Sequence, residues 1–153
     1  MLLDGVNHIG LVTDDIDRFI EFYEGVFEVR VDGVEHTPFG TLTFISIGPH
    51  TELNVFHLNE DQQLDLTRGS MFTHGPIDHM GLQANSKESF DEIRRRLMAR
   101  GATDGFVTDF GSKYSLFFRD PDGLECEVLV TPEHAGPGGP PGTPAPGYEV
   151  GVP

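Results

Sequence analysis

Two histidines stand at matching places in a sequence that repeats itself. The segment NHIGL at residues 7–11 returns as DHMGL at residues 78–82, which puts His8 and His79 in equivalent positions. A repeat of this kind predicts two related structural units that need each other to bury their apolar faces. Imidazole nitrogens contributed by two such units are suited to hold a metal ion at a pseudo-twofold axis.

Other polar side chains fall on the same side of the predicted strands as these histidines. Alternation along each strand places the apolar residues toward the helices. Polar groups among apolar neighbours cost free energy unless they are partnered, and two imidazoles with one or two carboxylates would be partnered by a divalent ion. The polar side collects His8, His79, Glu52, Asn54, Glu125 and Glu127.

Each of these residues also has a plainer interpretation. A single histidine on a strand is most often hydrogen-bonded or half-exposed, and the repeat is what favours a ligand role for both histidines. Glu52 is equally compatible with an edge position, and Glu127 with a solvated face. Glu125 is expected at a solvated strand end, whereas Cys126 alternates to the other side and is expected in the core.

The elements that would position these residues form two runs of the same order, βαβββ. In the first run, a strand is followed by a helix that Asp14 or Asp15 caps, and then by three more strands. The apolar stripe of that helix comprises Ile16, Phe19, Ile20, Tyr23 and Phe27. The predicted strands span 6–13, 28–34, 41–47 and 52–58.

The second run repeats this order. Asn85 or Ser86 caps its helix, and Gly101 ends it. The apolar stripe comprises Phe90, Ile93, Leu97 and Met98. The predicted strands span 77–84, 102–109, 113–119 and 125–131, with a tight Asp-Pro-Asp-Gly turn at 120–123.

Composition divides the chain into four segments. The first module is expected at 1–58, a polar connection at 59–76 and the second module at 77–131. The remaining segment, 132–153, contains seven of the 11 prolines and six glycines. Such a segment has little to bury and is predicted to be a disordered or polyproline-like tail, with packing of its closing residues, 148–152, as the less favoured alternative.

The overall charge excludes some classes of partner. The formal net charge is −15, which disfavours nucleic acid and anionic membrane surfaces because their phosphates need Lys and Arg. No apolar run approaches the ~20 residues of a membrane span. A single cysteine and an N-terminus without an export signal favour a cytoplasmic protein.

Three motifs together resemble the vicinal oxygen chelate superfamily, which includes glyoxalases, extradiol dioxygenases, methylmalonyl-CoA epimerases, and fosfomycin and bleomycin resistance proteins. The motifs are NHIGL at 7–11, DHMGL at 78–82 and FRDPDGLECE at 118–127. The resemblance covers the chain up to Thr131. It implies an α+β fold in which paired βαβββ modules form a curved mixed-sheet cup with the helices on the outside.

The resemblance also implies a metal site in the cup. His8, His79 and Glu127 would be its ligands, joined in some members by a fourth-strand residue, here Glu52 or else Asn54. One divalent ion per site is expected, and Zn, Ni, Co, Mn and Fe all fit these ligand types. Such proteins usually form homodimers and bind a small-molecule substrate.

The chemistry that requires the fewest groups is a glyoxalase-like lyase or isomerase/epimerase reaction through a metal-chelated oxyanion. It needs a metal and a carboxylate base, for which Glu127 and Glu52 are the candidates. Extradiol ring cleavage is one alternative. Enzymes of that kind usually have a histidine and a tyrosine before the Asp-Pro-x-Gly turn, but here the tyrosine position is occupied by Phe117 and the histidine position falls at 108–110. Tyr114 is displaced by three residues and would point to the opposite face of its strand. The other alternative is a metal-free, bleomycin-resistance-like drug-binding protein, because an acidic protein suits a cationic drug.

Overall fold

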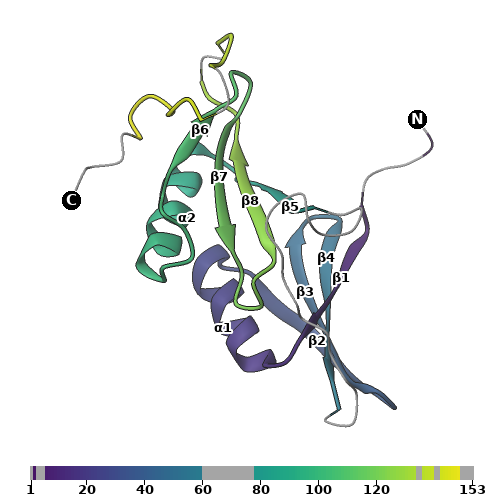
Figure 1. Cartoon of the computed structure of the whole chain (residues 1–153). Coiled ribbons are helices and arrows are strands. Elements are labelled where there is room, and N and C mark those ends of the chain that lie inside the picture. The colour runs from purple at the N-terminus through teal and green to yellow at the C-terminus, as the bar shows by residue number, and fades with distance from the viewer. Residues whose placement is uncertain (1, 3–5, 60–77, 134–135, 140–141, 149–153) are drawn as a thin grey trace. The chain divides into compact units, whose positions relative to one another are not determined.

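The computed structural model describes residues 2, 6–59, 78–133, 136–139 and 142–148. The chain divides into two compact units, Met1–Thr67 and Arg68–Pro153. Each unit contains one βαβββ module, coloured purple to teal for the first and teal to green for the second (Figure 1). The predicted connection at 59–76 lies outside the described residues except for Asn59. Among the described residues, no helix is long and apolar enough to cross a membrane.

The first module is one mixed four-stranded sheet with a helix. The strand order is β1-β4-β3-β2, with β1 parallel to β4 and the other pairs antiparallel. The pairing of β1 with β4 sets His8 opposite Glu52 and Gly10 opposite Asn54. The elements are β1 His8–Thr13, α1 Ile16–Phe27, β2 Arg30–Thr37, β3 Gly40–Gly48 and β4 Thr51–Leu58.

The second module has the same topology. Its strand order is β5-β8-β7-β6, again with one parallel pair, β5 with β8. The two matching sheets confirm the predicted α+β fold with paired βαβββ modules. The elements are β5 Met80–Gln83, α2 Lys87–Ala99, β6 Val107–Asp109, β7 Tyr114–Arg119 and β8 Glu125–Val130.

The helix boundaries follow from local capping. Asp15 caps α1 by accepting a hydrogen bond from the Arg18 backbone N–H at 3.0 Å, and Ser86 caps α2 in the same way from Ser89 at 3.1 Å. Gly101, just past α2, has a φ of +67°, a conformation that glycine adopts without strain. The predicted caps of both helices are therefore confirmed.

The buried face of α1 is rotated from the predicted stripe. Phe19 and Tyr23 are buried as expected, but their companions are Phe22 and Val26. The predicted members Ile16, Ile20 and Phe27 remain partly exposed. Apolar residues cover so wide an arc of this helix that two overlapping stripes satisfy the same 3.6-residue period, and only packing selects between them.

The helix-facing sides of both sheets form the core of each module. The buried residues on these sides include Ile45, Leu53 and Val55 in the first module and Met80, Leu116, Cys126, Val128 and Val130 in the second. Cys126 is fully buried, as its alternation predicted. With their apolar residues turned to the core, the strands present their polar positions on the opposite side of each sheet.

Residues 142–148 differ from the disordered tail that composition predicted. Pro144 forms an antiparallel bridge with Thr108 of β6. The Ala145 backbone N–H donates to the Val107 carbonyl at 2.9 Å, and the Asp109 N–H donates to the carbonyl of residue 143 at 2.9 Å. This segment therefore adds a short backbone pairing to the outer edge of the second sheet.

Tyr148 anchors this segment to the second module. Its side chain is buried, and its ring meets Phe90 of α2 and Tyr114 of β7 edge to face, with centroid distances of 5.7 and 5.9 Å. Its hydroxyl donates a hydrogen bond to Asp91. The prediction was wrong here because composition averages over a segment, whereas one buried aromatic side chain can offset the ordering cost of a few residues.

Candidate functional site

The second module brings His79 and Glu127 together. The Nε2 atom of His79 lies 3.5 Å from Oε2 of Glu127, and Glu127 is largely buried, with 8% of its surface exposed. Glu127 pairs with Gly81 across the parallel β5–β8 ladder, and a Cβ at Gly81 would lie 3.7 Å from that same Oε2. Glycine therefore keeps the space beside the carboxylate open.

Ser115 holds the other oxygen of this carboxylate. Its hydroxyl, on the neighbouring strand β7, donates a hydrogen bond to Oε1 of Glu127. Ser115 is fully buried, so the bond is shielded from water and fixes the carboxylate in one orientation. Oε2 is then the oxygen that faces His79.

Phe117 forms the apolar side of this group. It pairs with Glu127 across the antiparallel β7–β8 ladder, and its ring meets His79 edge to face at a centroid distance of 5.4 Å. The place that a tyrosine would occupy for extradiol chemistry thus has no acid–base group. Tyr114 contacts Tyr148 on the helix side of the sheet, as its displacement predicted.

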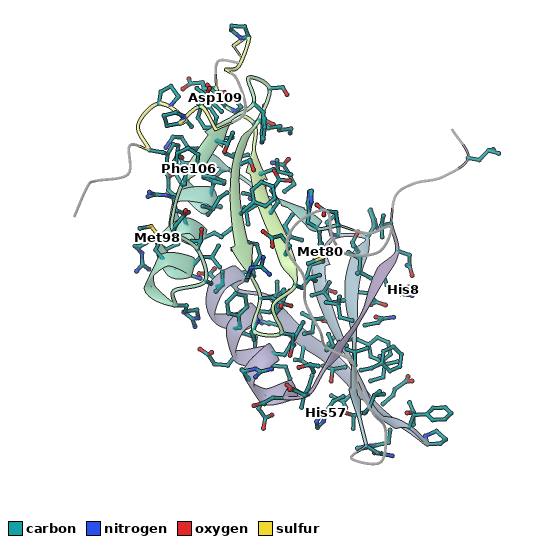
Figure 2. The ribbon with its side chains drawn as sticks, in the orientation of Figure 1. His8, His57, Met80, Met98, Phe106 and Asp109 are labelled. Carbon is teal, nitrogen blue, oxygen red and sulfur yellow. The ribbon has the colours of Figure 1, made fainter. Side chains whose placement is uncertain are left out.

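Both histidines have their Nδ1 atoms anchored by the residue before them. Nδ1 of His79 lies 2.8 Å from Oδ2 of Asp78, and Nδ1 of His8 lies 2.9 Å from Oδ1 of Asn7. Hydrogen bonding at Nδ1 fixes the orientation and the tautomer of the ring and leaves Nε2 able to coordinate a metal ion. His8 is exposed at the start of β1 (Figure 2).

Register identifies the first-module counterpart of Glu127. Gly10 pairs with Asn54 as Gly81 pairs with Glu127, so Asn54 is the counterpart, and Glu52 lies one pleat earlier, opposite His8. Oδ1 of Asn54 is buried and has no hydrogen-bond partner among the described residues. A buried amide oxygen without a donor is a costly arrangement that a bound cation would relieve.

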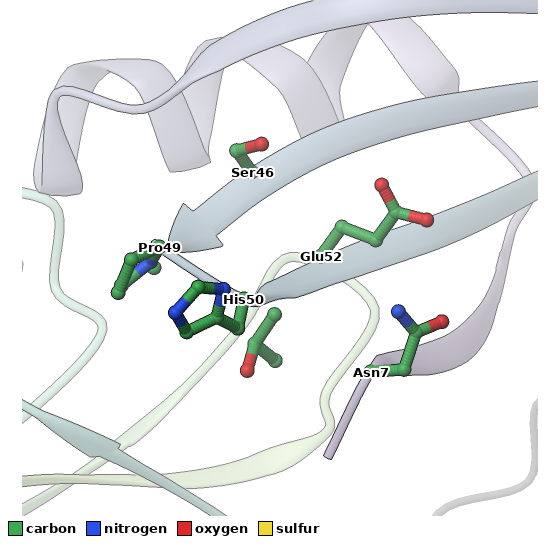
Figure 3. Close-up of a pocket in the computed structure, with 7 residues that line it drawn as sticks. Asn7, Ser46, Pro49, His50 and Glu52 are labelled. Atoms are coloured by element: carbon green, nitrogen blue, oxygen red, sulfur yellow. The ribbon is translucent and has the colours of Figure 1, made fainter. Parts of the chain in front are cut away.

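Glu52 lies instead in a polar hollow at one end of the first sheet. The hollow has a volume of about 200 Å³, and Asn7, Ser46, His50 and Glu52 are among the residues that line it (Figure 3). Ser46 is the cross-strand partner of Glu52 on β3. In this hollow, the carboxylate of Glu52 could act as a base that is accessible to water.

Glu125 differs from its predicted solvated position. It forms an ion pair with Arg119, its cross-strand partner on β7, and only 12% of its side chain is exposed. The turn between them is as predicted: the Asp120 carboxylate accepts from the backbone N–H groups of Asp122 and Leu124 at 3.0 and 2.7 Å. This short turn places Glu125 and Arg119 side by side, which explains the pairing.

The candidate ligands are divided between the modules. The second module contributes the close pair His79 and Glu127, and the first contributes His8 beside Glu52. Within the part of the chain that the structure describes, no three His, Cys, Asp or Glu side chains form one metal-binding group. Sequence reasoning missed Ser115, which only strand pairing reveals, and the anchors Asn7 and Asp78, although both stand in the repeated motif.

Comparison with known proteins agrees with this architecture. A family model described as the Glyoxalase/Bleomycin resistance protein/Dioxygenase superfamily matches residues 5–128. A domain with that same description from Frankia sp. EAN1pec is 21% identical over 86% of this chain and 94% of that chain, with a TM-score of 0.65.

Two further solved structures share the fold. A lactoylglutathione lyase from Agrobacterium tumefaciens is 25% identical over 85% of this chain and 96% of that chain, with a TM-score of 0.58. A genomically encoded fosfomycin resistance protein from Listeria monocytogenes is 16% identical over 86% of this chain and 97% of that chain, with a TM-score of 0.60.

Proposed function

Because the chain belongs to the glyoxalase/bleomycin resistance protein/dioxygenase superfamily, we propose that it is a divalent-metal-dependent enzyme with a small-molecule substrate. The reaction would be of glyoxalase-like type, lyase or isomerase/epimerase. The observation that carries this proposal is the matched anchoring of the two histidines. Each has its Nδ1 held by the preceding side chain and its Nε2 left for a ligand role.

The proposed ligands are His8, His79 and Glu127. Two neutral imidazoles and a carboxylate suit a divalent first-row ion such as Zn, Ni, Co, Mn or Fe. Among fourth-strand residues, the register favours Asn54 over Glu52 as an additional oxygen ligand, and the unpartnered Oδ1 of Asn54 supports this choice. Glu52 is then available as a base.

The remaining chemistry is divided between the two glutamates. A bound divalent ion would supply Lewis acidity to two neighbouring substrate oxygens. Ser115 keeps Oε1 of Glu127 occupied, which supports a ligand role for Glu127 and disfavours its release as a mobile base. Glu52, in its polar hollow, is the better candidate to accept a proton from the substrate.

The alternatives receive less support. Phe117 lacks the acid–base group that extradiol cleavage requires at its place, which argues against a dioxygenase. A metal-free binding protein would have no need for paired histidine anchors. The likeness to a lactoylglutathione lyase supports lyase chemistry but does not identify a substrate.

We also propose that the protein forms a homodimer, which light scattering would test.

Metal analysis of the purified protein tests the proposal. The wild type should retain about one divalent ion per site, and His79→Ala should retain much less because the site loses an imidazole ligand. His36→Ala is the matched control, since His36 is an exposed histidine on β2, and it should retain metal like the wild type. Equal metal content in wild type and His79→Ala would reject the metalloenzyme proposal.

A further inference from the structure

We propose that Lys113 binds a carboxylate group of the substrate, at the far end of the sheet face that carries His79 and Glu127. The inference rests on the proposed function, because it identifies which class of chelating molecule the site accepts. The substrate would be an organic anion that has two neighbouring oxygens at one end, a short apolar link and a carboxylate at the other end.

The position of Lys113 follows from strand alternation. Its ammonium group contacts Gln83, four residues beyond His79, and Thr131, four residues beyond Glu127. Side chains an even number of residues apart on a strand share one face. At ~3.3 Å per residue, four residues correspond to a separation of about 13 Å along the strands.

The ammonium group is fixed in place by neutral oxygens. Nζ of Lys113 donates to Oε1 of Gln83 at 3.1 Å and to Oγ1 of Thr131 at 2.7 Å. The Gln83 amide is itself oriented, because its Nε2 donates to the carbonyls of Ala84 and Leu129 at 3.0 and 3.1 Å. An ammonium has three donors, so one remains for a further acceptor.

The charge of Lys113 has no counterion among the described residues. Its contacts there are with uncharged oxygens, in a chain whose net charge is −15. The only other lysine, Lys87, lies on α2 and is paired with Asp91 at 2.7 Å. A hydrogen-bonded cation with no carboxylate partner in the described part of the chain, on the face that bears the proposed metal ligands, is the arrangement expected for recognition of an anion.

The surface between the two ends indicates the middle of the substrate. Leu129, half-buried, lies between Glu127 and Thr131 on β8, and Gly81 lies between His79 and Gln83 on β5. A leucine beside a glycine leaves a shallow apolar strip, which suits a hydrocarbon link. The high negative charge of the whole protein favours cationic ligands in general, so the local cation is what would select an anion.

Two hydroxamates of equal chain length test the inference on zinc-loaded protein. Octanohydroxamate offers two neighbouring oxygens and an uncharged tail, and the monohydroxamate of suberic acid adds a terminal carboxylate. By calorimetry, the carboxylate probe should bind the wild type about tenfold more tightly, the value of one charge-assisted hydrogen bond. Equal affinities for the two probes would overturn the inference.

Variants at the two lysines provide the controls. Lys113→Met should lose the preference for the carboxylate probe, Lys113→Arg should keep most of it, and Lys87→Met should keep it in full. Added salt should weaken the preference in the wild type, because it screens an exposed charge pair. A preference that persists in Lys113→Met would overturn the assignment of Lys113.

Separate measurements distinguish this inference from the proposed function. Zinc content is determined for every variant, and a wild type that binds no zinc would reject the proposed function. The lysine is then tested on metal-free protein with octanoate alone, by NMR. Octanoate should shift the side-chain amide signal of Gln83 in the wild type but not in Lys113→Met. No shift in the wild type would overturn the anion site independently of the metal.

Discussion

The two modules share one topology but differ in chemistry at equivalent positions. In the second module, Gly81 pairs with Glu127, and Phe117 pairs with that glutamate from the other side. In the first module, the same places in the ladders belong to Gly10, Asn54 and Phe44. The glycine and the aromatic residue are kept, whereas the carboxylate is replaced by a neutral amide.

The neighbouring positions diverge in the same direction. Ser115 and Gln83 of the second module both lie next to Leu129, and the corresponding residues around Phe56 in the first module are Leu42 and Val12. Around Leu129 the second module thus carries hydrogen-bonded polar side chains, whereas the equivalent positions around Phe56 in the first module are apolar. The two repeats therefore share one strand topology while the side chains on the face away from the helix differ.

The sheet edges differ as well. The outer edge of β6 is paired with the segment that contains Pro144, which Tyr148 anchors. One of the two edge strands of the first sheet, β2, carries Val34 with 53% of its surface exposed. An edge strand presents unpaired backbone groups, and the C-terminal segment pairs with part of that edge in the second sheet. Within the described part of the chain, no segment pairs with β2 in this way.

Of the changes considered, making the second module resemble the first should have the largest effect, which is a loss of metal affinity. Glu127→Gln replaces the carboxylate by an amide, as Asn54 does in the first module. We expect a loss of metal affinity larger than the ~10–100-fold that loss of an outer-shell partner causes. Competition with a chelator measures the affinity, and Glu125→Gln, one pleat away, is the control. Unchanged affinity in Glu127→Gln would exclude Glu127 as a metal ligand.

Removing the anchor of the C-terminal segment should destabilise the second module. Tyr148→Ala deletes a buried ring with two aromatic contacts and a hydrogen bond to Asp91. We expect the free energy of unfolding to fall by about 3 kcal/mol, as for other large-to-small changes at buried aromatic residues. Urea unfolding measures it. Phe39→Ala, at a residue with 62% exposure, is the control and should be nearly neutral; a neutral Tyr148→Ala would mean that the segment does not stabilise the module.

The hydrogen bond from Ser115 to Glu127 occurs in the second module, and removing it tests whether it contributes to metal affinity. Ser115→Ala leaves Oε1 of the carboxylate without its donor, so the orientation of Glu127 is no longer fixed. We expect metal affinity to fall about tenfold, as for other outer-shell partners. Chelator competition measures the change, and Ser46→Ala in the first module is the control. Equal affinities for both variants and the wild type would assign Ser115 a purely structural role.

Adding a carboxylate to the first module makes it resemble the second and should increase metal affinity. Asn54→Asp places a charge where the unpartnered amide oxygen lies, and metal affinity should rise by a factor of a few.

Glu52→Gln should leave metal retention unchanged while lowering turnover, if Glu52 acts as a base. A loss of metal in Glu52→Gln together with no gain in Asn54→Asp would show that Glu52 is the fourth-strand ligand.

The smallest effect is on stability at high pH. Burial, with a contribution from the hydrogen bond to Asp91, raises the pKa of Tyr148 to about 12, and hydrogen bonding to Asp91 raises the pKa of Lys87 to about 12. The unfolded chain loses the tyrosine proton near its ordinary pKa of about 10, so the stabilisation is complete below pH 10 and is lost between pH 10 and 12. Tyr148→Phe should flatten this decline, measured by urea unfolding across that range. An equally steep decline in Tyr148→Phe would assign it to Lys87 and other groups.

Most of the fold was predictable because its signals are local. Apolar alternation, the caps at Asp15 and Ser86 and the turn after Asp120 each depend on a few neighbouring residues, so both βαβββ runs were expected. The rotation of α1 toward Phe22 and Val26 was not, since its broad apolar arc satisfies more than one stripe. The burial of Tyr148 was not the favoured expectation either, because it depends on Phe90 and Tyr114, which are distant in the sequence.

The sequence by itself determined the two modules, their histidines and the set of glutamates from which a site can be chosen. Alternation decides which side of a strand a residue faces, but it does not decide what lies beside it. The tertiary structure decided that Glu127 lies beside His79 and Ser115, that Glu125 is used by Arg119, and that Asn54 is the counterpart of Glu127. These distinctions depend on cross-strand register, which is set by the pairing of segments far apart in the chain and leaves no local signal.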